Sequence, residues 1–231
     1  NSADTALKAY LVNEGYVIND IIADDIFAAL YTSADAYADY DVLFLSEVIS
    51  SVNATAFKTA GYPVPCVSTE GYCIMSDRWG WIENNDTQFF QKTAVDPDED
   101  MKTLIIDDAE HYITKWYGEG TEVDWTSIES ITGEGVTGMN LDQTMSEAFQ
   151  LAHFKHADYE SFPSLWAVPA GSSVTHPGNS EEIPVNIVIL GIHRVGLEGG
   201  YATPAFNDLI KRSLEWATDN LSSVEDIVDN R

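Results

Sequence analysis

Two acidic residues stand where short apolar runs end. Glu47 follows the run VLFL through Ser46, and Glu70 follows PVPCVST and precedes Gly71 and Tyr72. A carboxylate at the carboxyl edge of a parallel sheet can act as a general base or accept hydrogen bonds from sugar hydroxyls. The alternative is a structural one, in which each acid caps the N–H groups of the turn that follows. We therefore take Glu70 as a catalytic candidate and Ser46, Glu47, Gly71 and Tyr72 as binding candidates.

A histidine follows the strongest apolar run of the chain. His193 comes directly after PVNIVILGI, whose unbroken apolar character is typical of a strand buried on both faces. An imidazole there could form an acid–base pair with Glu70 across neighbouring strand ends. The alternative is a strand-end histidine bonded only to the backbone. The catalytic prediction is thus the pair Glu70 and His193.

The other residues with reactive or metal-binding side chains form no convincing site. Cys66 lies inside an apolar run, which predicts a buried free thiol. His153 and His156 are spaced H-x-x-H, whereas paired helical ligands need i, i+4 spacing or further ligands. The acids at 96, 98 and 100 resemble the start of a calcium loop, but the required glycine and closing glutamate are missing. We predict no metal and no cofactor.

Composition limits the partners. The chain has 231 residues, 45% of them hydrophobic, and a formal charge of −27 from 38 acidic and 11 basic residues. Such a surface repels nucleic-acid phosphate and anionic lipid, so we expect neither nucleic acid nor membrane as a partner. The acids are spread along the chain, which favours a solvated coat over a cation site and suits extracytoplasmic surroundings. No apolar run reaches the roughly 18 residues of a membrane helix.

Alternating strand and helix patterns predict an α/β fold. Pro63 and Pro65 place the start of the second strand near Cys66. The expected strands cover 16–22, 42–45, 66–69, 104–106, 164–168 and 184–192, and the expected helices 3–14, 53–60, 140–154 and 203–217.

Four motifs, taken in order, resemble the class I glutamine amidotransferase-like superfamily: VLFLSEVISS, STEGY, DDAEHYIT and VILGIHRVG. The nearest branch is the ThuA-like (trehalose-utilisation) proteins with their uncharacterised secreted bacterial relatives. The resemblance covers about residues 3–218 and is weakest near 118–162. It implies a flavodoxin-like three-layer sandwich with a mainly parallel central sheet, and a single domain over 1–231 with an irregular insertion at about 118–162.

In active members of that superfamily a cysteine occupies a tight strand-to-helix turn flanked by glycines. Here that turn falls at Glu70 and Gly71, while Cys66 lies within the strand and Cys73 lies beyond the turn. The resemblance therefore implies a member without amidotransferase activity, expected to be a binding or accessory domain of an extracytoplasmic, carbohydrate-related system with a small-molecule or carbohydrate ligand.

Two enzyme alternatives remain open. One is a metal-independent hydrolase or sugar-modifying enzyme that uses Glu70 and His193. The other is an amidotransferase that uses Cys66 or Cys73. Tyr72 together with Trp79 and Trp81 would form either a stacking platform for sugar rings or a part of the core.

Overall fold

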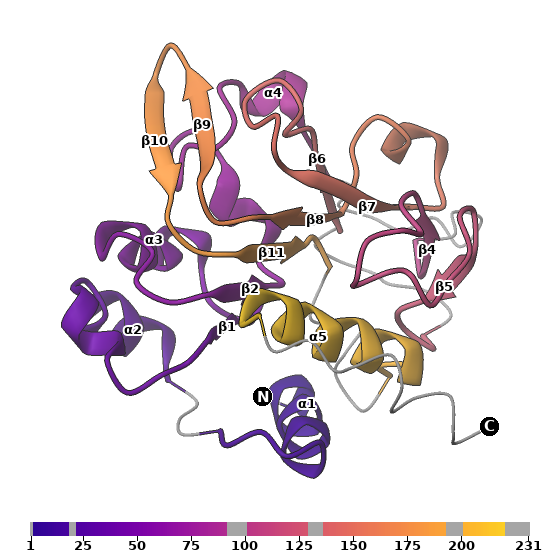
Figure 1. Cartoon of the computed structure of the whole chain (residues 1–231), viewed down its shortest axis with the longest axis horizontal. Helices are drawn as coiled ribbons and strands as arrows, with labels where there is room; N and C mark the ends of the chain where they lie inside the picture. The colour runs from indigo at the N-terminus through magenta and orange to yellow at the C-terminus, as the bar shows by residue number, and fades with distance from the viewer. Residues whose placement is uncertain (1, 19–21, 92–100, 129–135, 193–200, 220–231) are drawn as a thin grey trace.

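A central sheet of seven strands organises the molecule (Figure 1). The computed structural model describes residues 2–18, 22–91, 101–128, 136–192 and 201–219. The strand order is β1-β2-β11-β8-β7-β4-β5. The strands are β1 (Leu43–Leu45), β2 (Cys66–Ser68), β4 (Thr103–Ile106), β5 (Glu122–Asp124), β7 (Phe149–Phe154), β8 (Leu165–Val168) and β11 (Ile187–Leu190).

The sheet is parallel on one side and antiparallel on the other. β2 pairs in parallel with both β1 and β11, and the crossover between β1 and β2 is the predicted helix, α3 (Ser51–Thr59). From β11 outward the pairs β11–β8, β8–β7, β7–β4 and β4–β5 are antiparallel. Antiparallel neighbours need no helical crossover, and no α-helix among the described residues joins β4 to β5 or β7 to β8. The α/β, flavodoxin-like class is confirmed, with a mixed sheet whose parallel part is β1, β2 and β11.

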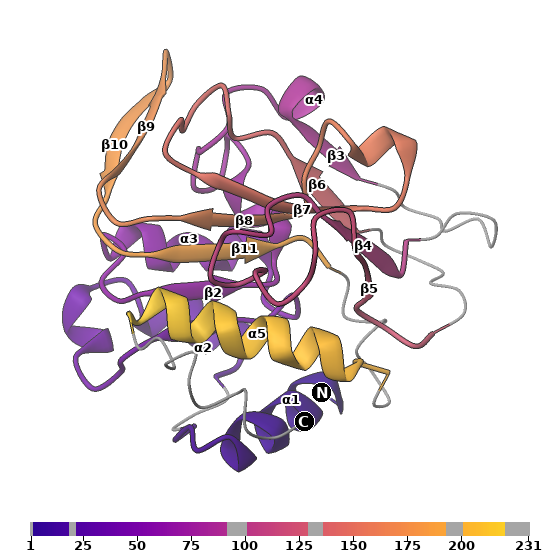
Figure 2. The same cartoon turned by 45° about the vertical axis from the view of Figure 1, so that its right-hand side comes forward.

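Helices cover both faces of the sheet, as a three-layer sandwich requires. Along β11, Ile187 and Ile189 belong to one hydrophobic cluster and Val188 and Leu190 to the other, which is the period of two expected of a strand. One cluster contains side chains of α1 (Ser2–Asn13) and α5 (Pro204–Ala217), and the other contains side chains of α2 (Asp24–Leu30) and α3. α1 lies directly below α5 in Figures 1 and 2.

Local sequence signals set several of these elements. α5 begins as predicted, because the Thr203 side chain accepts a hydrogen bond from the Phe206 N–H at 3.0 Å and Pro204 occupies the first turn. β2 begins at Cys66, the point that Pro63 and Pro65 indicated.

The remaining elements lie outside the central sheet. β9 (Ser172–His176) and β10 (Asn179–Ile183) form a hairpin that projects from the top of the molecule in Figure 1. β3 (Phe89–Gln91) pairs with β6 (Thr137–Met139). The short helical turns are η1 (Ala34–Tyr37), η2 (Gly71–Ile74), α4 (Asn85–Gln88) and η3 (Ala157–Tyr159).

Two predicted elements are wrong where the structure describes them. The region 140–154 is not a helix, because its second half is β7, held between β4 and β8. The paired neighbours of this segment override its partly helical spacing of apolar residues. In the region 16–22, the residues Tyr16–Ile18 and Ile22 are not in a strand, and residues 19–21 lie outside the described part.

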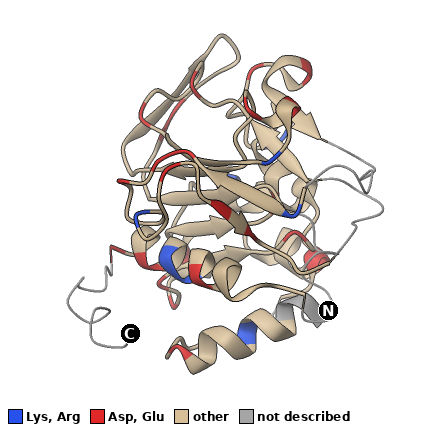
Figure 3. Cartoon of the chain, turned by 90° about the vertical axis from the view of Figure 1, so that its right-hand side faces the viewer, with Lys and Arg blue, Asp and Glu red and all other residues tan. Residues whose placement is uncertain are grey.

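Acidic residues are spread over many elements rather than gathered on one (Figure 3). None of the helices within the described ranges is both long enough and apolar enough to span a lipid bilayer.

Candidate functional site

The first two strand ends lie side by side, as their sequence predicted. Leu45 pairs with Ser68, and the Thr69 N–H donates to the Leu45 carbonyl at 2.8 Å. The Glu47 N–H then donates to the Thr69 hydroxyl at 2.9 Å. Ser46 and Glu47 therefore share one edge of the sheet with Glu70, and we call this edge, from Ser46 to Glu47 and from Thr69 to Gly71, the β1–β2 rim.

Glu70 is used as a cap in this structure. Its residue surface is 5% exposed, and its Oε1 accepts a hydrogen bond from the Tyr72 N–H at 2.9 Å at the start of η2. Its own N–H donates to the Ser68 hydroxyl at 3.1 Å. This hydrogen bond is the capping role expected as the structural alternative for Glu70, and a catalytic role for its carboxylate stays a prediction.

The space beside the Glu70–Gly71 turn is filled by β6. A Cβ added at Gly71 would lie 2.0 Å from the Thr137 Oγ1, and one added at Gly191 would lie 2.1 Å from the Thr137 carbonyl oxygen. The Thr137 N–H donates to the Gly191 carbonyl at 2.8 Å, which holds β6 against the end of β11. The Glu70–Gly71 turn is thus closed on this side by backbone and by the Thr137 side chain.

Neither cysteine is placed to act as a nucleophile. Cys66 lies within β2 and Cys73 within η2, and both are fully buried free thiols, as predicted for Cys66. Burial raises the pKa of each thiol well above its ordinary value, and for Cys73 the nearby Glu70 carboxylate adds to the rise in pKa. Both side chains are therefore neutral near pH 7, whereas thiol catalysis requires the thiolate.

The histidines divide into one that is not described and several with structural roles. His193 lies outside the described residues, so its pairing with Glu70 stays a prediction. The His153 Nδ1 lies 2.7 Å from the Asp107 Oδ1, and His156 caps η3. Within the described ranges no group of three or more His, Cys, Asp or Glu side chains is arranged to hold a metal ion.

The aromatic residues after the rim belong to the core. Trp79 and Trp81 are fully buried, and their indole N–H groups donate to the Ala54 carbonyl and the Tyr62 hydroxyl, each at 3.0 Å. Tyr72 is half-buried, with its hydroxyl bonded to Gln91. These tryptophans offer no stacking platform for a sugar ring, so the core alternative holds for them.

A polar cleft lies elsewhere, beside the β9–β10 turn. Its volume is ≈ 340 Å³, within the range of about 300–1,000 Å³ typical of small-ligand sites. Three segments of the chain line it: Lys58 at the end of α3, Ser76, Arg78, Gly80 and Glu83 after η2, and His176, Gly178 and Asn179 of the hairpin. We call it the hairpin cleft.

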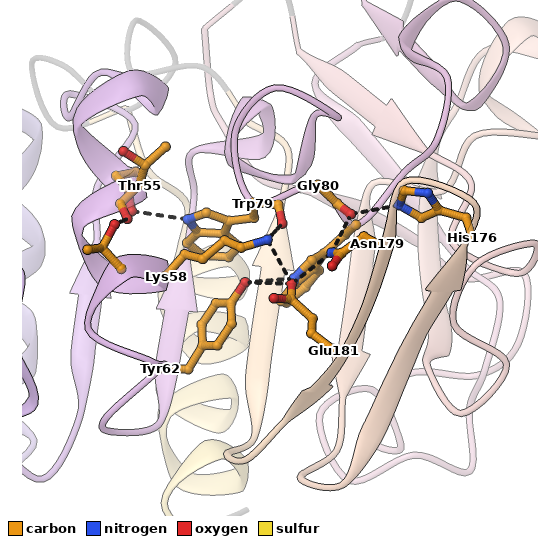
Figure 4. A network of polar contacts seen from close by, with 11 residues as sticks. Thr55, Lys58, Tyr62, Trp79, Gly80, His176, Asn179 and Glu181 are labelled. Carbon is orange, nitrogen blue, oxygen red and sulfur yellow. Dashed lines mark hydrogen bonds and ion pairs between the residues drawn. The ribbon is translucent and has the colours of Figure 1, made fainter.

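Hydrogen bonds to one carbonyl hold the hairpin against the rest of the cleft (Figure 4). The Gly80 carbonyl accepts from the His176 Nε2 at 2.9 Å and from the Asn179 Nδ2 at 3.0 Å. The Glu181 Oε1 accepts from Lys58 at 2.9 Å and from Asn179 at 3.0 Å. Lys58 also donates to the Trp79 carbonyl. The cleft is therefore formed by groups whose positions are fixed by one another.

Reasoning from the sequence missed this cleft. Its three contributing segments are separated by long stretches of chain, and the hairpin that joins them is not part of the central sheet. The one local signal was the dipeptide Pro177-Gly178, which marks a turn and would have placed His176 and Asn179 on either side of it.

The comparisons with known proteins establish the fold. No family model and no curated protein matches the chain. A Salmonella typhimurium protein described as cytoplasmic is similar with a TM-score of 0.55 and 12% identity, covering 92% of this chain and 86% of that one. A Bacteroides uniformis protein described as ThuA-like is similar with a TM-score of 0.50 and 12% identity, covering 94% and 86%. The chain has a ThuA-like fold.

Proposed function

We propose that this chain is a ligand-binding or accessory domain of the class I glutamine amidotransferase-like superfamily that lacks glutaminase activity. The observation that carries the proposal is the hydrogen bond between the Glu70 carboxylate and the Tyr72 N–H. At the turn where an amidotransferase displays its nucleophile, this chain has an acid that is used to cap the next helical turn.

The packing around the rim supports the same conclusion. A thiol catalyst needs an exposed thiolate beside free backbone N–H groups that stabilise the oxyanion. Here the two thiols are buried and neutral, the N–H of Tyr72 is bonded to Glu70, and Thr137 fills the space beside Gly71. Each of these features argues against acyl transfer at this turn.

The proposal extends to the surroundings of the domain. We propose an extracytoplasmic location, because a net charge of −27 suits a strongly solvated acidic surface. The class of ligand that we propose is a small molecule or carbohydrate. The supporting feature for a small ligand is the hairpin cleft, whose lining offers both cationic and anionic groups.

Turnover and binding can be separated by experiment. The intact chain is screened for hydrolysis of glutamine and of chromogenic esters and glycosides, and is applied in parallel to a glycan and sugar-acid array. We expect retention on the array without turnover. Turnover that is lost in both Glu70→Gln and His193→Ala would instead establish the hydrolase alternative and refute the non-catalytic role.

A further inference from the structure

Both cationic side chains of the hairpin cleft carry hydrogen-bond donors that none of the described residues uses. The Lys58 ammonium has three N–H groups, of which the Trp79 carbonyl and the Glu181 Oε1 take two. The Arg78 guanidinium uses Nε toward Ser51 and Nη1 toward Asp77, and its Nη2 has no partner among the described residues. These unused N–H groups carry positive charge and suit a carboxylate.

The lining of the cleft also offers an acceptor. Glu83 is exposed, lines the same cleft, and its carboxylate has no partner within the described ranges. Ser76 lines the cleft as well, and a serine hydroxyl can donate or accept. A ligand that presents a carboxylate to the cations and hydroxyls to Glu83 and Ser76 would satisfy all of these groups.

The lining argues against a neutral sugar held by stacking. Among the described side chains that line the cleft the one aromatic ring is the His176 imidazole, which is bonded to the Gly80 carbonyl, and the nearby Trp79 and Trp81 are fully buried. Proteins that bind neutral sugars without charge contacts depend on apolar and aromatic surface for much of their affinity. Recognition here must come from charge and hydrogen bonds.

The strongly acidic surface does not prevent an anion from binding at this place. The Debye length is about 8 Å at physiological ionic strength, so most of the other carboxylates of the chain are screened from the cleft. Lys58 and Arg78 lie in the lining itself and would touch the ligand without intervening solvent. Glu181 and Asp77 each accept from one of these cations, so a ligand carboxylate would be held by the remaining N–H groups rather than by a net positive charge.

The cleft is also held in shape before a ligand arrives. The Gly178 N–H donates to the His176 Nδ1 at 3.1 Å, so His176 carries its proton on Nε2 and donates to the Gly80 carbonyl. A site fixed in this way spends little binding free energy on ordering its own side chains.

We infer that the hairpin cleft binds a small hydroxylated carboxylate of the sugar-acid class, with Arg78 and Lys58 on the carboxylate and Glu83 on a hydroxyl. The inference rests on the proposed function, because it names the ligand and the site of that binding role.

Isothermal titration of the intact chain with D-glucuronate, with D-glucose as the neutral counterpart, tests it. Arg78→Gln should weaken glucuronate binding at least tenfold, because a charge-assisted hydrogen bond is lost. Arg78→Lys should retain more of the affinity than Arg78→Gln. Lys155→Gln, which removes an exposed positive charge paired with Glu122 on β5, should leave the affinity unchanged. A thermal melt of each variant confirms that it is folded.

Absence of glucuronate binding, equal binding of glucose, or binding that Arg78→Gln leaves unchanged would each overturn the inference. If a ligand from the array binds independently of Arg78, the hairpin cleft is not the binding site, whereas the proposed ligand-binding function is retained. Glucuronate binding that requires Arg78, found together with turnover that requires Glu70, would keep the site and refute the non-catalytic role.

Discussion

The substitution Gly71→Ala tests whether Thr137 fills the space beside Gly71, a packing that we call the closed rim. The new Cβ would lie 2.0 Å from the Thr137 Oγ1 and 3.1 Å from the Gly191 Cα, where ordinary contacts begin at 3.4 Å. Thr137 would have to move by roughly 1.4 Å, although its backbone N–H is bonded to Gly191. Gly71 does not have a positive φ, so backbone strain adds nothing to this steric effect.

The expected size of the effect follows from two opposing contributions. Overpacking a filled site costs about 1–3 kcal/mol, and three close contacts place Gly71→Ala near the upper end of that range. Alanine reduces the entropy of the unfolded chain and returns about 0.4–1 kcal/mol. We expect a net loss of about 2 kcal/mol in the free energy of unfolding, measured by urea denaturation with the fluorescence of the six tryptophans.

A second substitution identifies the side chain responsible. The Thr137 Oγ1 has no hydrogen-bond partner in the part of the chain that the structure describes, so Thr137→Ala removes the clashing atom without breaking a bond there. The double variant should lose about 1 kcal/mol less unfolding free energy than the two single variants lose in total. Gly178→Ala, whose Cβ would meet only His176 at 3.4 Å, is the matched control and should change stability by less than about 0.5 kcal/mol. A loss below about 0.5 kcal/mol for Gly71→Ala, or purely additive effects, would refute the closed rim.

Two further predictions concern stability. Burial lowers the pKa of His111 from 6.5 to about 4. Between these two pH values the unfolded chain binds a proton that the folded chain does not. The free energy of unfolding should therefore fall by about 2 kcal/mol from pH 7 to pH 5. His111→Gln should remove that part of the pH dependence in denaturant titrations, and an unchanged slope would contradict the assignment. Thr203→Ala should lower the free energy of unfolding by about 1 kcal/mol, because the Phe206 N–H at the start of α5 loses its acceptor. A melting temperature equal to that of the original chain would show that this cap contributes nothing.

The sequence predicted those features that depend on neighbouring residues. The apolar runs located β2, β8 and β11, the prolines located the start of β2, and Thr203 with Pro204 located the start of α5. The adjacency of Ser46 and Glu47 to Glu70 followed from the rule that parallel strands end at one edge.

What the sequence could not predict depends on pairing between distant segments. β7 was predicted as a helix because only its neighbours β4 and β8 make it a strand. The insertion of Thr137 between Gly71 and Gly191 joins three parts of the chain that share no local pattern. The hairpin cleft was missed for the same reason, since its lining comes together only when the β9–β10 turn meets the Gly80 carbonyl.

Labelling with the glutamine analogue 6-diazo-5-oxo-L-norleucine tests the lack of glutaminase chemistry most directly. Intact-mass spectrometry of the native chain after incubation at pH 7 should show no adduct, because both thiols are buried and their pKa values are raised. An iodoacetamide reaction in denaturant should modify both Cys66 and Cys73, which confirms that they are free thiols. A stoichiometric adduct of the glutamine analogue on Cys66 or Cys73 of the native chain would contradict the account.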